Sequence, residues 1–357
     1  MPKRILVIAI RAIGDVVLVT PLLRLLKQKF PASYLGIVAD GPSAQVLHNN
    51  PHIDRLFTID RARSRRLPWL EQLNEWRTLI SEIRRERFDV IIDLFSGPRS
   101  AILAWLSGAP DRYAEDFRKA LRGFLYNRRV KVLRDGRHLV EQKLALIQPL
   151  VGQVKREETQ LEICLTQGEI EAGKSIFATQ SRGNRKRIGF VPGAGSRWRI
   201  WSGERFAELG DRLAEEFDAD IFLLGGKDDV SICQRISDLM RANPIDLSGK
   251  TSLRELMAVL AELDLVVTNV TGPLHLASVF SKPKVIGLYG AADTVQYAPW
   301  GNNVVMVTKG KPENAYWQKV DYARDYEHLL QISVTDVLGV ARKLLTPKPT
   351  PGETFSS

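Results

Sequence analysis

The chain has 357 residues, of which 44% are hydrophobic and 26% are charged. This composition is that of an ordinary globular protein, which argues against a disordered chain or a coiled coil, and the length suggests two domains. The formal net charge of +10 implies acidic partners, such as nucleic acid, phosphorylated substrates or an anionic membrane surface, and charge alone does not choose among them.

The two cysteines, Cys164 and Cys233, lie far apart in the sequence and show neither the spacing of a zinc site nor that of a disulfide framework. They fit a reducing compartment. The residues before the first strand lack the features of a signal peptide, and no apolar run approaches the roughly 20 residues that span a bilayer. We therefore expect a cytoplasmic protein.

The first predicted strand covers residues 5–10 and leads through a short loop into a helix that continues past Pro21. The loop lacks both the GxGxxG pattern of dinucleotide sites and the lysine of a P-loop. It holds Gly14 and Asp15, at the point where open α/β sheets place reactive groups. Asp15 is therefore a candidate catalytic residue, although a helix cap would put an aspartate at the same position.

Further strands alternate with helices through the first half, which indicates a parallel, doubly wound sheet. They are predicted at residues 34–38, 55–59 and 89–94. An amphipathic helix with basic ends covers residues 61–87 and carries Trp69 and Trp76. It is either a docking surface for acidic lipid or a helix that packs on the core and has a solvated basic flank.

A second basic section lies between residues 118 and 137, where a phosphate-binding cluster and a solvated loop would give the same pattern. Residues 138–151 form the next predicted helix. The polar segment from about residue 152 to 186 is the expected link between domains. The chain shows no repeat and no low-complexity linker.

The second half repeats the order of strand, loop and helix. A strand at residues 187–191 runs into a glycine-containing loop and then into an amphipathic helix at 202–217. The glycines allow close approach of the backbone, and Ser196, Arg197 and Arg199 supply hydrogen bonds and charge suited to a diphosphate. A surface turn is the alternative interpretation of this loop.

Other strand ends in this half carry the same kinds of residue. Gly226, Asp228 and Asp229 follow a strand at 221–224, where the glycine leaves room for a ring or ribose and the acids can accept hydrogen bonds from its hydroxyl or amino groups. Thr251 lies in a later turn, and a glycine ends the predicted strand at 285–290. Such convergence favours a ligand site more strongly than any one loop does.

The strand at residues 265–267 runs through a polar elbow into a predicted helix. Thr271 is suited to cap this helix, whose first turn holds Pro273. The free N–H groups of that turn and the helix dipole would bind an anion, and His275 lies close enough to join them. A capped helix in which His275 makes a structural hydrogen bond is the alternative.

Several of these segments together resemble the ADP-heptose:lipopolysaccharide heptosyltransferases of glycosyltransferase family 9. They are residues 13–22, residues 89–94, the Pro192-Gly193-Ala194 loop with Trp201, residues 248–253 and residues 271–277. The resemblance runs from about residue 4 to residue 345, and its motifs are specific in combination.

The resemblance implies an α/β protein of the GT-B type, with two doubly wound Rossmann-like domains that face a central cleft. Residues 1–165 would bind a lipid-linked saccharide acceptor, and residues 166–330 an ADP-sugar. Residues 331–357 would form a helix at 334–345 that crosses back, followed by a disordered tail. The implied enzyme inverts the anomeric carbon, needs no cofactor or metal, and works as a peripheral protein on the inner face of the cytoplasmic membrane.

The family's functional residues fall on residues of matching type at most positions. Its catalytic base falls on Asp15, and its helix-start motif falls on Thr271, Gly272, Pro273 and His275. In this scheme Asp15 takes the proton from an acceptor hydroxyl as that hydroxyl attacks the sugar carbon.

Three positions depart from the family pattern. Arg199 stands where the family has a lysine that steadies the diphosphate, and Ser202 replaces the proline after the tryptophan. Val270 stands where the family has an aspartate that contacts the sugar. The donor sugar is therefore expected to be held differently. Either the donor has an apolar edge that suits Val270, or an ordinary heptose is held through the neighbouring Asn269 with lower affinity. A structural alternative is that Val270 only extends the strand at 265–267.

The expected function is transfer of a sugar, taken to be a heptose, from an ADP-sugar to a lipopolysaccharide core or another lipid-linked saccharide. A family member with a different donor sugar is one alternative. Another is a nucleotide-sugar-binding protein without transfer activity, which Val270 suggests and Asp15 argues against. A nucleic-acid-binding protein rests on charge alone, since the basic residues are dispersed and no binding motif is present, so no nucleic-acid partner is expected.

Overall fold

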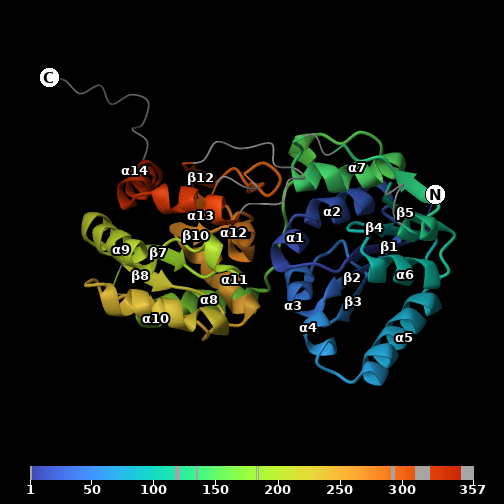
Figure 1. The fold of residues 1–357 in the computed structure, drawn as a ribbon, viewed down its shortest axis with the longest axis horizontal. Coiled ribbons are helices and arrows are strands. Elements are labelled where there is room, and N and C mark those ends of the chain that lie inside the picture. The colour runs from blue at the N-terminus through green and yellow to red at the C-terminus, as the bar shows by residue number, and fades with distance from the viewer. Residues whose placement is uncertain are drawn as a thin grey trace. The chain divides into compact units, whose positions relative to one another are not determined.

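The computed structural model of the chain describes residues 2–116, 121–133, 136–181, 183, 185–290, 294–309 and 322–346. The chain divides into two compact units (Figure 1). The first consists of Met1–Gln167 and Val295–Gly301, and the second of Gly168–Thr294 and Asn302–Ser357. Within the described residues, each unit is built around a six-stranded sheet.

All strands of the first sheet are parallel, in the order β3-β2-β1-β4-β5-β6. They are β1 (Arg4–Ala9), β2 (Tyr34–Asp40), β3 (Arg55–Ile59), β4 (Val90–Asp93), β5 (Asp111–Glu115) and β6 (Arg128–Val130). The winding direction of the chain reverses between β1 and β4. Open α/β sheets bind ligands beyond the carboxyl ends of the strands at such a switch point.

The α-helices described in the first unit are α1 (Ile13–Val17), α2 (Thr20–Lys29), α3 (Gly41–Ala44), α4 (Arg61–Ser64), α5 (Trp69–Arg85), α6 (Pro98–Leu106) and α7 (Leu139–Val151). In two places the sequence predicted one longer helix where the structure has two. The helix predicted past Pro21 is two helices, with Pro21 in the first turn of α2, where its missing N–H costs nothing. The helix predicted over 61–87 is likewise divided, because Pro68 restricts the residue before it and α5 begins only after it.

The second sheet has the same topology, with all strands parallel in the order β12-β11-β10-β7-β8-β9. They are β7 (Lys186–Val191), β8 (Ala219–Leu223), β9 (Ile245–Asp246), β10 (Leu265–Asn269), β11 (Lys284–Tyr289) and β12 (Val304–Thr308). The winding direction reverses between β7 and β10. Every strand predicted from the sequence is present in one of the two sheets.

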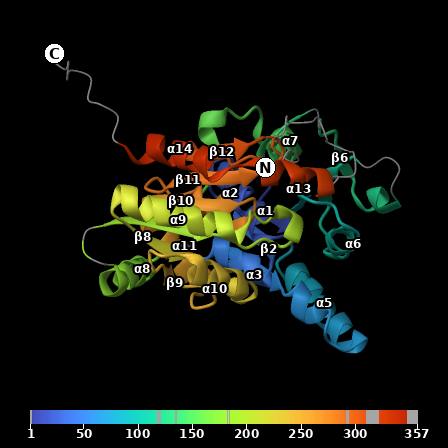
Figure 2. The same ribbon diagram turned by 60° about the vertical axis from the view of Figure 1, so that its left-hand side comes forward.

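Helices cover both faces of the second sheet, as a parallel sheet requires. They are α8 (Gln167–Gln180), α9 (Gly203–Phe217), α10 (Val230–Leu239), α11 (Leu253–Glu262), α12 (Gly272–Ala277), α13 (Tyr322–Gln331) and α14 (Val334–Leu345). Helices α9 and α14 lie side by side (Figure 2). Ser202 is the N-cap of α9, and its hydroxyl accepts a hydrogen bond from the Arg205 N–H at 3.3 Å. This contact gives the serine that replaces the family's proline a structural role.

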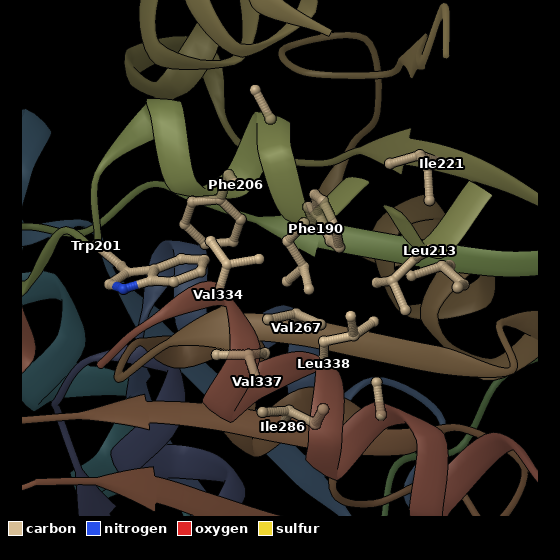
Figure 3. Packing of buried hydrophobic residues seen from close by; sticks show 14 of the residues in the cluster. Phe190, Trp201, Phe206, Leu213, Ile221, Val267, Ile286, Val334, Val337 and Leu338 are labelled. Carbon is tan, nitrogen blue, oxygen red and sulfur yellow. The ribbon is translucent and has the colours of Figure 1, made fainter. Parts of the chain in front are cut away.

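The core of the second unit fills the space between the sheet and these two helices (Figure 3). Phe190 and Val267 point into it from the sheet, and Phe206 from α9. Val337 and its neighbours on α14 complete it. The helix that was expected to cross back to the first domain is this α14, and its apolar stripe packs within the second unit. Residues 347–357, the expected tail, lie outside the described residues.

The described segment of the second half that belongs to the first unit is instead Val295–Gly301. Its contacts explain why. His138 Nε2 donates to the carbonyl of Ala298 at 2.6 Å, and Trp300 Nε1 donates to the carbonyl of Thr159 at 2.8 Å. Burial lowers the pKa of His138 to about 4, so this contact involves a neutral ring at physiological pH.

Candidate active site

Asp15 lies just beyond the carboxyl end of β1, in the first turn of α1. The N-cap of this helix is Ala12, so Asp15 is not the N-cap, although its carboxylate accepts a hydrogen bond from the Ala12 backbone. The side chain is 11% exposed, and Oδ2 accepts a hydrogen bond from Arg11 Nε at 3.1 Å. Burial raises the pKa of Asp15, and the positive charges of Arg11 and Lys143 oppose that rise. A buried carboxylate with a raised pKa is well suited to accept a proton.

Lys143 of α7 is a member of this site that sequence reasoning missed. The residue is 5% exposed, and its ammonium donates to the carbonyl of Leu94, just beyond β4. The ammonium lies 4.3 Å from the centre of the Phe95 ring, and the Arg11 guanidinium lies 5.0 Å from the same ring. Two cations therefore contact one aromatic ring at the switch point beside Asp15. A lysine between the apolar residues of α7 was the available signal, because such a residue is rarely buried without a partner.

A cavity of about 310 Å³ lies at the same switch point. Its lining includes Arg11, Arg61, Arg65, Arg99, Trp76 and Phe95. Arg61 pairs with Asp40 at 3.1 Å, whereas Arg65 and Arg99 pair with no carboxylate in the part of the chain that the structure describes. Guanidinium groups bind carboxylates and phosphates, and an aromatic face suits the apolar side of a sugar ring. The cavity thus has the chemistry of a site for an anionic saccharide.

Asp93, at the end of β4, is one of the residues that line this cavity. It is fully buried, and it accepts hydrogen bonds from the Tyr126 hydroxyl at 2.7 Å and from the Ser96 N–H at 2.8 Å. Burial raises the pKa of Asp93, and these donors oppose that rise. Because its oxygens are engaged by the protein, Asp93 shapes the turn after β4.

In the second unit, the loop between β7 and α9 carries three predicted site residues. Ser196 and Arg199 are half-buried, and Arg197 is exposed with its guanidinium 4.3 Å from the ring centre of Trp198. A short 3-10 turn spans Arg197–Arg199. The loop therefore presents two cations and a hydroxyl beyond the carboxyl end of β7.

Asn269, a predicted ligand contact, binds a neighbouring loop in the structure. It is completely buried at the end of β10. Its Nδ2 donates to the carbonyl of Pro192 at 2.7 Å, and its Oδ1 accepts from the N–H of Trp201 at 3.1 Å. One amide thus fastens both ends of the loop that holds Ser196 and Arg199. That Asn269 contacts the donor sugar stays a prediction, and its observed role is to hold this loop.

The loops after β7, β8 and β9 also contact one another. The Asp229 carboxylate lies so close to Gly193 that a Cβ there would approach its Oδ1 to 1.9 Å. The Gly225 carbonyl accepts the N–H of Gly249 at 3.0 Å, and Gly249 has a φ of +67° that favours glycine. The strand ends that the sequence singled out are therefore joined into one surface. Asp229, one of the acids that the sequence suggested for a ring or ribose, is the side chain that fills the gap between two of them.

Other predicted residues lie at the edge of this surface. Gly226 and Asp228 are exposed, and Thr251 is half-buried beside the capping box that starts α11. Asp229 Oδ2 accepts the N–H of Gly226 at 2.8 Å, which fixes the turn after β8. Asp228, by contrast, is free of the turn's internal bonds and faces solvent.

The elbow after β10 has the expected helix start but not the expected cap. Thr271 occupies the N-cap position of α12, yet its side chain caps no N–H of the helix and instead donates to the carbonyl of Asn269 at 3.4 Å. Val270, Gly272 and Pro273 are half-buried, and His275 is 5% exposed. The first-turn N–H groups of α12 thus lie at the switch point of the second sheet, between β7 and β10, and the threonine hydroxyl does not occupy them.

A model of glycosyltransferase family 9 (heptosyltransferase) matches residues 76–326, which is more than two thirds of the chain. The chain belongs to this family. It is 23% identical to lipopolysaccharide heptosyltransferase 3 of Escherichia coli over 342 residues, which cover 95% of this chain and 98% of that protein.

Solved structures give the same result for the fold. The family 9 glycosyltransferase of Veillonella parvula matches with a TM-score of 0.85 and 26% identity, covering 96% of this chain and 97% of that one. The Escherichia coli ADP-heptose lipopolysaccharide heptosyltransferase II matches with a TM-score of 0.76 and 22% identity, covering 96% and 98%. This family 9 glycosyltransferase thus has the GT-B fold of two Rossmann-like domains that the sequence predicted.

The described residues contain no group of three or more His, Cys, Asp or Glu side chains placed to hold a metal ion. Among the helices described, none combines the length and the apolar character that crossing a bilayer demands.

Proposed function

We propose that this family 9 glycosyltransferase transfers a heptose from an ADP-sugar to a lipid-linked saccharide of the lipopolysaccharide core type, with inversion at the anomeric carbon. The observation that carries the proposal is Asp15, a buried carboxylate of raised pKa at the switch point of the first sheet. Two relatives support the substrates, since one is a lipopolysaccharide heptosyltransferase and the other an ADP-heptose lipopolysaccharide heptosyltransferase.

In the proposed reaction, Asp15 accepts the proton of an acceptor hydroxyl while the hydroxyl oxygen forms a bond to the anomeric carbon. The bond from that carbon to the diphosphate oxygen breaks on the opposite side, and ADP leaves with the electron pair. Arg199, Ser196 and the first-turn amides of α12 stabilise the charge that grows on the diphosphate, an electrostatic contribution of roughly 3–4 kcal/mol per well-placed donor. The cation supplied by arginine lets the scheme run without a metal.

The acceptor is proposed to enter the cavity of the first unit, where Arg65 and Arg99 receive an anionic group and Trp76 contacts a sugar face. This assigns acceptor binding to residues 1–165 and donor binding to residues 166–330. A lipid-linked acceptor also implies that the enzyme works at the inner face of the cytoplasmic membrane as a peripheral protein. The exposed guanidinium groups of the cavity support this assignment, since a neutral saccharide would not need them.

The test is the variant Asp15→Asn, which removes the proton acceptor and keeps the size of the side chain. Transfer should fall by about 10²–10⁴-fold, while ADP affinity measured by calorimetry stays close to that of the natural chain. Unchanged turnover would dismiss Asp15 as the base. A natural chain that binds ADP-heptose but releases no ADP with any lipopolysaccharide acceptor would favour the binding protein without transfer activity.

A further inference from the structure

Helix α5 is covered along only half of its length. Ile83 is buried in the core of the first unit, and Trp76 is half-buried against it. The apolar residues continue toward the start of the helix, where Leu73 is 47% exposed, Leu70 60% and Trp69 70%. Both views show α5 projecting from the sheet of its unit (Figures 1 and 2). Three large apolar side chains that lie close together and are exposed to solvent indicate an interaction surface.

The residues just before this apolar end are basic. Arg63, Arg65 and Arg66 are exposed, and none of them pairs with a carboxylate in the described parts of the chain. Glu71 is the single acidic residue between positions 61 and 73. Apolar side chains bordered by arginines match the two layers of an anionic bilayer, its acyl chains and its phosphate headgroups. A second copy of this chain is a poorer partner, because it would bring two sets of arginines together.

The same segment also lines the cavity beside Asp15, through Arg65 and Trp76. Trp76 is seven residues from Trp69, which is about 10 Å along a helix. The headgroup layer on each side of a bilayer is roughly 5–8 Å thick. With Trp69 at the base of that layer, the cavity would open at about the height where the sugars of a lipid-linked saccharide emerge.

We infer that Trp69, Leu70 and Leu73, together with Arg63 and Arg66, form a membrane-docking surface that inserts into an anionic bilayer. Docking by this surface holds the cavity over the headgroup of a lipid-linked acceptor. The second statement rests on the proposed function, whereas the docking itself does not. Trp76 is not part of this surface, contrary to the expectation from the sequence, because it faces the core and the cavity.

The experiment measures partitioning of the full chain onto vesicles of phosphatidylglycerol and phosphatidylethanolamine, without donor or acceptor. The apolar variant combines Trp69→Ser, Leu70→Ser and Leu73→Ser, and we expect partitioning to fall by more than about tenfold, since each exposed side chain loses its burial in the acyl layer. The charge variant combines Arg63→Gln and Arg66→Gln, and each change should lower partitioning about fivefold at low salt. Vesicles of phosphatidylcholine alone should bind the natural chain weakly.

The matched control is Ile102→Ser with Trp105→Ser on α6, which are 49% and 54% exposed and lie outside the proposed surface. This control should partition as the natural chain does, within about twofold. An equal loss in the control and in the apolar variant would overturn the inference, because any exposed apolar group would then serve. A natural chain that ignores the anionic vesicles at low salt would also overturn it, and dimerisation through Trp69, Leu70 and Leu73 would then identify a second copy as the partner.

A second measurement separates this inference from the proposed function. With an acceptor saccharide freed of its lipid, the apolar variant should transfer sugar at the natural rate. With the lipid-linked acceptor in vesicles, its rate should fall in step with partitioning. A natural chain with no transfer on either acceptor would refute the proposed function and leave the vesicle result to decide the docking surface.

Discussion

The role of Asn269 can be tested by its replacement with alanine, because a positioning role and a ligand contact predict different results. In the structure its amide satisfies two backbone groups, the carbonyl of Pro192 and the N–H of Trp201, in a fully buried position. Asn269→Ala leaves both groups without their partner. An unpaired buried group costs about 1–3 kcal/mol, so the loss is roughly 2–6 kcal/mol in all.

For a domain of this size each kcal/mol lowers the melting temperature by about 2–4 °C, so thermal unfolding of Asn269→Ala should begin roughly 5–20 °C earlier. ADP affinity should fall as well, since the loop with Ser196 and Arg199 loses the anchor at both of its ends. Calorimetry with ADP and a thermal melt of the same samples measure both effects.

The control is Asn303→Ala. The Asn303 amide also holds backbone carbonyls, those of Phe280 and Pro283 at 2.8 Å each, but it does so before β11, at the amino end of the parallel strands. This variant should be destabilised and should keep its ADP affinity. An Asn269→Ala protein that melts like the natural chain and binds ADP-heptose poorly would refute the positioning role and restore Asn269 as a direct contact to the sugar.

Arg11→Gln removes a charge that lowers the pKa of Asp15, so that pKa should rise further; because the base works deprotonated, the acidic limb of kcat/KM against pH should move to higher pH, with little change on the alkaline side. An acidic limb that stays in place would separate Arg11 from the base. Arg199→Ala should weaken ADP binding and slow transfer together, as calorimetry and ADP release would report; equal values for both would exclude Arg199 from the diphosphate site. Val270→Asp should raise the use of ADP-heptose relative to other ADP-sugars by about 2–10-fold, the worth of one hydrogen bond. Efficient use of ADP-heptose by the natural chain, unimproved by the aspartate, would show that Val270 does not affect donor choice.

The central strands of both sheets could be predicted from the sequence because they are buried on both faces and appear as apolar runs. The last two strands of the first sheet could not. β5 (Asp111–Glu115) and β6 (Arg128–Val130) are short and charged, and they are strands only because their backbones pair with a neighbour. β12 is different, since the apolar run at Val304–Thr308 was a usable signal that the sequence analysis did not take.

The site divides in the same way. Asp15 was found because a strand end followed by a helix is a local pattern. Lys143 and the cavity arginines were not found, because their meeting depends on contacts between segments far apart in the chain: Arg61, Arg99 and Lys143 come from three different helices. A local sequence pattern predicts which strand ends hold polar, potentially functional residues. It does not predict which side chains from distant parts of the chain lie beside them.

The contacts of Asn269 bear on how the donor sugar is bound in a chain that has Val270 where the family has an aspartate. The sequence left open that Asn269 replaces the family's aspartate as a partner for the donor sugar. In the structure the carbonyl and the NH₂ of Asn269 each bind the loop that they hold in place, and the side chain is completely buried. We therefore expect the adjustment to the missing carboxylate to come from Val270 itself, which is half-buried and apolar. The remaining choices are a donor that presents an apolar edge at this point or a heptose bound without that hydrogen bond, and the donor panel on Val270→Asp distinguishes the two.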